Sequence, residues 1–448
     1  MRRWVILRRV LAGVVVLLVL AGVGGYWYAR PLLLTGTGYA AHSACALQSL
    51  AGRTDAQSDL PPNALVPYLR TSTDEQGAST TILGALARQR AWSTPDDGCV
   101  LTADRPAQNA AAAPVTAGAN PFTNATAPTT DPATEALVAE AFGDDLPAAK
   151  QSALGTRAVL VVRDGQLVAE RYAAGFTKDT RQLGWSMSKS VANLVVGRLV
   201  LDQGLRLDRA GLRPEWTDER RAITLDQLMR MTSGLTWDET YDLGTEITAM
   251  LYLEADMPAF VAAQPSAHAP GTYQQYSSGS TNLLCWAAAD LTGIDPRSLL
   301  REQLFRPLGL TSAVMETDAT GNPVCSSYVW ATPRDWAAIG QFALQGGTWG
   351  GQALLPAGWM ERSTTDVPVQ KSEEEGYAAG WWVNQRSTGD LVDPRLPADA
   401  YWASGHDGQR VFVVPSKGLV VVRLGFSPTI TGDDLRIAGV VGKLAAAQ

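Results

Sequence analysis

A serine and a lysine lie three residues apart in this sequence, at positions 186 and 189. On a helix, Ser186 and Lys189 share one face of the first turn. A serine hydroxyl is a poor nucleophile until a neighbouring base takes its proton, and a lysine that leaves bulk water near a helix N-terminus loses its own proton more readily. The pair would supply a nucleophile, a base and a positive helix end for a developing anion. Taken alone, the spacing is also that of an ordinary helix with a serine cap.

A tyrosine further along the chain is the second chemical candidate. Tyr276 lies in a loop rich in glycine, serine and threonine, residues 270–282, that leads into an apolar helical stretch. A phenol beside a lysine can be driven towards phenolate, and it can then accept a serine proton. Read in isolation, Tyr276 is equally a structural loop tyrosine.

The third candidate is a glycine-flanked stretch near the C-terminus. Small residues at positions 405 and 408 would let a strand edge approach a ligand closely. Next to Gly408, the backbone N–H of Gln409 would join that of Ser186 as an oxyanion hole. His406 and Asp407 would donate to, or position, a bound carbonyl or leaving group. The alternative is a glycine-rich strand entry with a solvated histidine.

In this order and setting, the three stretches resemble one superfamily. Residues 156–425 are similar to the serine β-lactamase-like hydrolases, above all to the branch that holds class C-type esterases and 6-aminohexanoate-dimer hydrolase. The motifs that carry the resemblance are residues 184–190, 225–235, 276–279, 328–336 and 405–409. The resemblance implies Ser186 as nucleophile with Lys189 and Tyr276 as the base pair, needs no metal or organic cofactor, and puts the His-Asp-Gly stretch in place of the family's Lys-Thr-Gly strand.

Two departures from the family pattern bear on the substrate. Antibiotic-hydrolysing members have Tyr-x-Asn where this chain has Ser278 as the third residue, and a lysine where it has His406, a group mostly neutral near pH 7. Both favour esters or amides without a fixed carboxylate. The same branch has a substrate-facing loop tyrosine, which suggests Tyr241 here. Trp382, with Trp381 and Trp402, would line an apolar acyl cleft, although tryptophans at such positions also serve as core.

Other functions fit parts of this pattern. Residues 184–188 are one residue away from the Gly-x-Ser-x-Gly turn of α/β-hydrolases, but Lys189 in the next turn and the lack of alternating strand–helix units argue against that fold. A penicillin-binding D,D-peptidase or β-lactamase is a second reading. A third is a sensor that binds or acylates penicillin without turnover.

The surrounding pattern predicts an α+β fold. Apolar residues at helical spacing after Ser186 predict a helix to about residue 203, ended by Gly204. Residues 158–172 read as a β-hairpin with Asp-Gly in its turn, and residues 410–424 as a second hairpin. Strands at both ends with helices between them indicate an antiparallel sheet flanked by helices, plus a helical lobe.

The N-terminus predicts a membrane anchor. An uncharged run from residue 10 to residue 28 would be about 28 Å long as a helix, close to the ~30 Å hydrocarbon core. Four arginines precede it, which places the N-terminus in the cytoplasm and the catalytic domain outside, in a bacterial cell envelope. The competing reading is a cleaved signal peptide. The net charge of −7 argues against a nucleic-acid partner.

The chain therefore divides into five expected parts. They are a basic tail (1–9), the anchor (10–28), an extracytoplasmic N-terminal segment (29–106), an Ala/Pro/Thr-rich linker or strap (107–134) and the hydrolase domain (135–448). The expected state is a monomer acting on a small ester, amide or peptide. Outside the cytoplasm the four cysteines can form Cys45–Cys99 and Cys285–Cys325 bridges or remain buried thiols, and their spacing does not favour a metal site.

Overall fold

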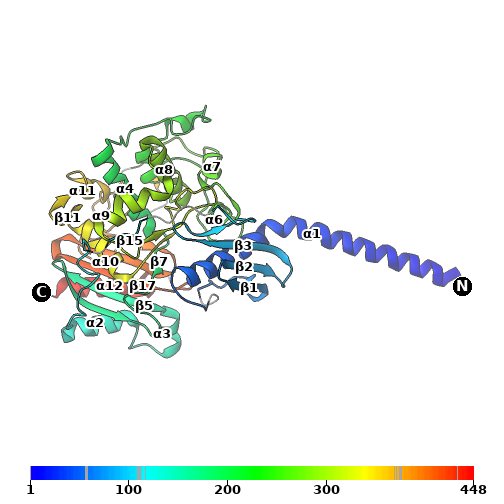
Figure 1. The fold of residues 1–448 in the computed structure, drawn as a ribbon, viewed down its shortest axis with the longest axis horizontal. Coiled ribbons are helices and arrows are strands. Elements are labelled where there is room, and N and C mark those ends of the chain that lie inside the picture. The colour runs from blue at the N-terminus through cyan, green and yellow to red at the C-terminus, as the bar shows by residue number, and fades with distance from the viewer. Residues whose placement is uncertain are drawn as a thin grey trace.

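A computed structural model describes residues 2–55, 59–107, 113–116, 118–367, 369, 371–372, 376–430 and 432–447. Its centre is a six-stranded antiparallel sheet (Figure 1). In spatial order the strands are β14 (Trp382–Val383), β15 (Tyr401–Gly405), β16 (Gln409–Val414), β17 (Leu419–Gly425), β5 (Thr156–Arg163) and β6 (Gln166–Tyr172). Both predicted hairpins are present. Positive φ values of 48° and 76° at Asp164 and Gly165 give the turn that matches the right-handed twist of the strands.

Helices cover both faces of this sheet. Alternate side chains of a strand point to opposite faces, so each strand packs against both layers of helices. On β5, Val159 and Val161 pack with α2 (Pro132–Phe142) and α12 (Ile437–Ala446). Leu160 and Val162 belong to the larger core on the other face, with α4 (Met187–Gln203) and α10 (Pro333–Leu344). The predicted α+β class is confirmed. The antiparallel order also excludes an α/β-hydrolase, whose sheet is built from alternating strand–helix units.

A helical lobe sits on the α4 side of the sheet. Its helices are α5 (Leu225–Met229), α6 (Glu246–Leu253), α7 (Met257–Ala262), α8 (Ser278–Thr292), α9 (Arg306–Leu308) and α11 (Trp359–Ser363), and α3 (Ala148–Leu154) lies outside it, before β5. The short strands are β7 (Gln182–Leu183), β8 (Tyr273–Gln274), β9 (Val314–Met315), β10 (Val329–Ala331), β11 (Thr348–Trp349), β12 (Gln352–Ala353) and β13 (Lys371–Ser372). A disulfide joins Cys285 of α8 to Cys325, which is one of the two pairings considered from the sequence.

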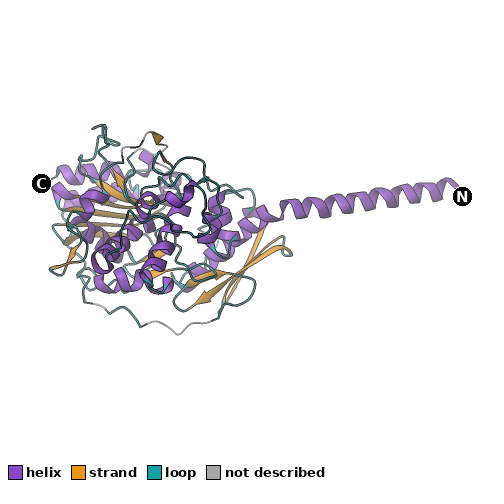
Figure 2. Ribbon diagram, turned by 90° about the horizontal axis from the view of Figure 1, so that it is seen from above, coloured by secondary structure: helices purple, strands orange, loops and turns teal. Residues whose placement is uncertain are grey.

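The N-terminal segment forms a module of its own beside this domain. Helix α1 (Arg2–Ser49) packs its C-terminal half on a sheet of β1 (Leu69–Asp74), β2 (Gly77–Ile82), β3 (Leu86–Thr94) and β4 (Gly98–Leu101), and its N-terminal half projects away from the body (Figures 1 and 2). The Cys45–Cys99 disulfide ties the helix to β4. The helix thus continues beyond residue 28, the predicted boundary of the anchor, and small residues such as Ala41 and Ala44 pack it closely against the sheet.

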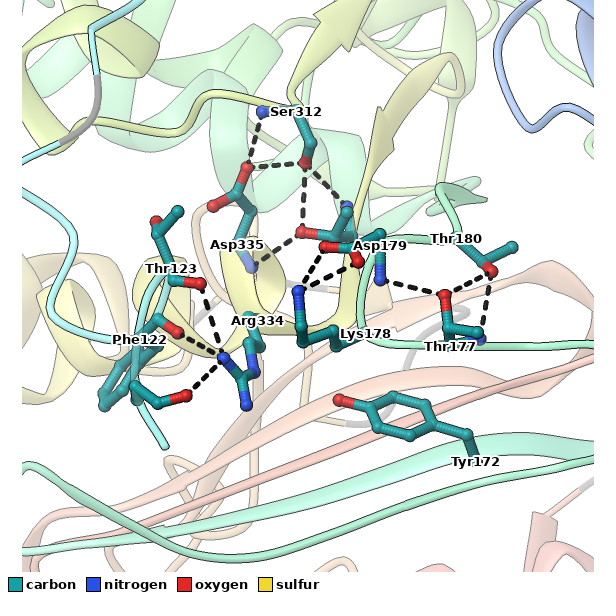
Figure 3. Close-up of polar contacts among 12 residues, drawn as sticks. Phe122, Thr123, Tyr172, Thr177, Lys178, Asp179, Thr180, Ser312, Arg334 and Asp335 are labelled. Atoms are coloured by element: carbon teal, nitrogen blue, oxygen red, sulfur yellow. Dashed lines mark hydrogen bonds and ion pairs between the residues drawn. The ribbon is translucent and has the colours of Figure 1, made fainter. Parts of the chain in front are cut away.

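The described part of the Ala/Pro/Thr-rich segment is a strap. Phe122 is buried, and Arg334, only 3% exposed, donates to the carbonyls of Phe122 (3.0 Å), Thr123 (3.4 Å) and Ala125 (2.8 Å) (Figure 3). The same guanidinium makes a bidentate pair with Glu170 of β6, at 2.7 and 3.0 Å. Residues 108–112 and 117 of the predicted segment lie outside the described residues.

Replacing Arg334 by methionine is expected to destabilise the protein by about 3–5 kcal/mol, because it leaves the buried Glu170 carboxylate without its cation. The free energy of unfolding from urea titration of the full chain in detergent measures the change. Arg206→Met is the matched control. Its ion pair with Asp208 is exposed, so about 0–1 kcal/mol is expected. Equal losses of unfolding free energy in the two variants would show that the buried Arg334–Glu170 pair stabilises the protein no more than an exposed ion pair does.

Candidate active site

Ser186 stands at a sharp turn between β7 and α4. Trp185 has φ +48°, a left-handed conformation that costs of order 1–3 kcal/mol for a non-glycine residue. Gly184 is held against Trp336 so closely that a Cβ would come within 2.3 Å of its ring. Between residues 184 and 197 every residue is buried except Ser186, which is partly exposed. The strained turn therefore presents one hydroxyl to the outside at the start of a helix that is interior up to residue 197.

Lys189 lies one turn along α4 and is 2% exposed. Its ammonium donates to Ser186 Oγ (2.9 Å), Ser278 Oγ (2.9 Å) and the Ser326 carbonyl (3.1 Å). Burial lowers the pKa of Lys189 to about 8, while the Glu239 carboxylate 4.0 Å away acts in the opposite direction. A lysine in this state is neutral often enough near neutral pH to take a proton from Ser186.

Tyr276 is the third member of the group. Lys189 Nζ lies 4.6 Å from the centre of its ring. Burial raises the pKa of Tyr276 well above its ordinary value, and the nearby Ser186 hydroxyl opposes that shift only in part. This direction favours the protonated phenol, and a role of Tyr276 as a base beside Lys189 stays a prediction. In the resting site Tyr276 is a proton donor, and Lys189 is the candidate base.

Glu239 is a member of the site that sequence reasoning missed. It accepts hydrogen bonds from Ser278 Oγ (2.5 Å), from the Ser278 N–H (2.8 Å) and from Trp237 Nε1 (2.6 Å). Ser278, which stands where antibiotic-hydrolysing members have an asparagine, links Lys189 to this carboxylate. The sequence signal for Glu239 was weak, since only its position two residues before Tyr241 set it apart.

The His-Asp-Gly stretch lies beside Ser186, at the end of β15. The His406 ring is 4.5 Å from Tyr241 and 5.7 Å from Trp185, and its Nδ1 is 2.8 Å from the Asp407 carboxylate. Tyr241 also packs edge-on against Trp185 at 6.0 Å. Asp407 (φ +57°) and Gly408 (φ +88°) form a tight left-handed turn before β16. This turn and the Tyr241 loop are brought to the same side of the nucleophile.

The backbone N–H of Gln409, which was expected to line an oxyanion hole, is engaged elsewhere in this structure. Its backbone N–H donates to the His406 carbonyl, which closes the turn. Its buried side chain donates to the Gly425 carbonyl at 2.6 Å and accepts from the Gly425 N–H at 3.0 Å. Gln409 braces β16 against β17 in this conformation, and an oxyanion role for its N–H stays a prediction that requires the turn to open.

The three tryptophans that were expected to line an acyl cleft lie in different surroundings. Trp382 stacks on Tyr276 at 5.7 Å, so it borders the site. Trp381 is fully buried and donates to Asn193 at 3.2 Å, and Trp402 packs on Phe412 on the α2/α12 face of the sheet. Trp381 is therefore core, and Trp402 is partly buried against the core of the α2/α12 face. Within the described ranges, no group of three or more His, Cys, Asp or Glu is arranged to hold a metal ion.

The geometry agrees with comparisons to known proteins. The family model described as Beta-lactamase matches residues 136–429, more than half of the chain, and the chain belongs to this family. The chain is 28% identical to the 6-aminohexanoate-dimer hydrolase of Paenarthrobacter ureafaciens over 299 residues, which is 61% of this chain and 73% of that protein. The protein is thus a hydrolase of the β-lactamase fold, in agreement with the predicted class of enzyme.

Two solved structures share the fold. A penicillin-binding protein homolog from Caulobacter crescentus matches with TM-score 0.54 and 18% identity, covering 71% of this chain and 98% of that one. A family VIII carboxylesterase matches with TM-score 0.53 and 18% identity, covering 70% and 97%. Both matches leave part of this chain uncovered, as expected if the N-terminal module is an addition to the shared fold.

The pKa of Lys189 sets an expected pH dependence. If neutral Lys189 is the base, kcat/KM for p-nitrophenyl acetate rises with pH and levels off with a midpoint at about 8. Glu239→Gln is expected to move this midpoint to lower pH, because the carboxylate favours the charged form of Lys189. The pH profiles of the two proteins are the measurement. Asp242→Asn, which removes an exposed carboxylate from the same loop, is expected to leave the midpoint in place. A midpoint that does not fall in Glu239→Gln would contradict this assignment.

Proposed function

We propose that the protein is a membrane-anchored, extracytoplasmic serine hydrolase that cleaves ester or amide bonds through an acyl-enzyme on Ser186. The observation that carries the proposal is the meeting of two distant parts of the chain, the start of α4 and the loop before α8, at one partly exposed hydroxyl. Lys189 donates to Ser186 Oγ at 2.9 Å, and the same Nζ lies 4.6 Å from the centre of the Tyr276 ring. Because the chain belongs to a hydrolase family, this arrangement is best explained as the catalytic group of a hydrolase.

The chemistry follows from the protonation states. Neutral Lys189 takes the Ser186 proton, and Oγ attacks the substrate carbonyl. The backbone N–H of Ser186, with that of Gln409 once its turn opens, would hold the tetrahedral oxyanion. Tyr276 gives its proton to the leaving group and regains one from Lys189. Water then attacks the acyl-enzyme by the same route and releases the acid.

Two features of the site support an ester or amide without a carboxylate. The position of the family's Lys-Thr-Gly lysine is held by His406, and the position of its asparagine by Ser278, which is committed to Lys189 and Glu239. A substrate carboxylate would find no fixed ammonium at His406. Tyr241 packs on Trp185, the neighbour of the nucleophile, and Trp382 packs on Tyr276, so both would contact uncharged parts of the substrate.

The membrane part of the proposal rests on α1. In the described chain one helix is long and apolar enough to cross a bilayer, and that helix is α1. Residues 35–48 of the same helix pack into the folded body, and Cys45 is disulfide-bonded to Cys99. A signal peptide would have to be cut from a continuous helix, so retention as an anchor is favoured. The arginines before the apolar run favour the body on the outer side.

Turnover of p-nitrophenyl butyrate by the full chain in detergent tests the proposal. Ser186→Ala is expected to lower kcat by at least about a thousandfold, and Tyr276→Phe by about 10²–10⁴, because it removes the proton donor. Ser387→Ala, an exposed serine away from the site, is the matched control and should be unchanged. Stable labelling by a fluorescent penicillin without ester turnover would instead identify a binding protein or sensor.

A further inference from the structure

The tip of the β2–β3 hairpin lies beside the membrane helix. The Ala87 N–H at the start of β3 donates to the Tyr26 hydroxyl of α1 at 3.3 Å. Leu83 and Leu86, which flank this turn, are 62% and 42% exposed, although both are large and apolar. Tyr26 belongs to the aromatic end of the apolar run, where a headgroup interface is expected. The two leucines are therefore held at the depth of that interface.

The loop that carries Glu239 and Tyr241 reaches the same helix. Gly244, at the end of this loop, lies so close to α1 that a Cβ on it would come within 2.4 Å of Leu32 Cδ2. Leu32 is four residues beyond Tyr28, which is about 6 Å along a helix axis. One wall of the candidate active site is thus attached to α1 just above the membrane interface.

A cleft opens between this loop and the N-terminal module. Its volume is about 540 Å³, within the roughly 300–1,000 Å³ range of ligand pockets. Its inner end is formed by Tyr241 and His406, both of which pack against Trp185 beside the nucleophile. The opposite wall comes from Thr35 and Tyr39 of α1 and from residues 61–64. The cleft therefore adjoins the candidate active site through Tyr241 and His406, and its outer wall lies outside the β-lactamase-like domain.

The position and chemistry of the cleft restrict what can fill it. Thr35 and Tyr39 lie about 10 and 16 Å beyond Tyr28 along α1, just outside a headgroup layer roughly 5–8 Å thick. Among the described residues that line the cleft, none is lysine or arginine, and Asp242 supplies a carboxylate. Tyrosine rings, prolines and threonines make up most of the rest. Such a lining favours uncharged, partly apolar ligands over anions.

We propose that the body rests on the bilayer through Leu83 and Leu86, and that the cleft receives a neutral amphiphilic ester or amide from the membrane surface. This inference rests on the proposed function and adds the substrate class and its route of access. The N-terminal module then has two roles. It fixes the height of the active site above the bilayer, and it supplies the outer wall of the subsite for the part of the substrate beyond the scissile bond.

The test uses the full chain reconstituted in phosphatidylcholine vesicles with two esters, p-nitrophenyl palmitate dissolved in the bilayer and p-nitrophenyl acetate in water. The double variant Leu83→Ser/Leu86→Ser is expected to hydrolyse the palmitate at least about fivefold more slowly, because it removes exposed apolar surface from the interface, and the acetate at the unaltered rate. Leu201→Ser/Leu391→Ser, which changes two exposed leucines outside the N-terminal module, is the matched control and should leave both rates unchanged. Equal palmitate rates in the hairpin variant and the control would overturn the proposal.

A second variant keeps the test independent of the hairpin. A flexible Gly/Ser insert of twenty residues between Arg30 and Pro31 keeps the anchor but lets the body stand about 25 Å from the bilayer. The palmitate rate is expected to fall at least about threefold, and the acetate rate to be unchanged. Loss of acetate turnover in the unmodified protein would refute the proposed function, whereas normal acetate turnover with no effect of the insert would refute only the membrane route.

Discussion

The burial of one lysine is the constraint on which the rest of the site depends. Lys189 has almost no contact with water, and two serine hydroxyls and a carbonyl take its hydrogen bonds. Desolvation makes its charged form costly, and the Glu239 carboxylate limits that cost. The balance leaves a base whose pKa is about 8, close to where a general base works best. An exposed lysine at the same spacing would stay protonated and would not activate Ser186.

The position of Lys189 in the fold accounts for this burial. Helix α4 is interior from Met187 to Gly197, so a polar side chain on this part of it is desolvated whether or not it has a function. The strained turn at Trp185 then lets only Ser186 reach the surface. Tyr276 and Ser278 close the group from the entry of α8, and Glu239 joins it from a loop. Four elements thus contribute one or two atoms each, which is typical of sites in which geometry is set by a rigid scaffold.

The N-terminal module makes this chain different from a bare β-lactamase-like domain. Its helix is at once the apolar segment and a wall of the cleft, and the Cys45–Cys99 bridge fixes the helix to its sheet. Contacts at Tyr26 and Leu32 tie both the hairpin and the active-site loop to the end of the apolar run of α1. In the membrane-anchored arrangement proposed above, the same element would set both the height of the body above the bilayer and the shape of the cleft.

The sequence by itself determined the parts of this protein that depend on local patterns. Helix α4 with its glycine stop, the two hairpins of the large sheet, the family, and the candidate residues Ser186, Lys189 and Tyr276 could all be read from periodicity, turn residues and short motifs. The tertiary structure alone decided which neighbours desolvate each group. For this reason it raised the pKa of Tyr276, placed Glu239 behind Ser278, engaged the Gln409 N–H in a turn, put Trp381 in the core and packed Trp402 against the α2/α12 side. It also carried α1 past residue 28 to the wall of the cleft. A pKa or a free N–H depends on atoms that are distant in the chain, and no local pattern records which of them will meet.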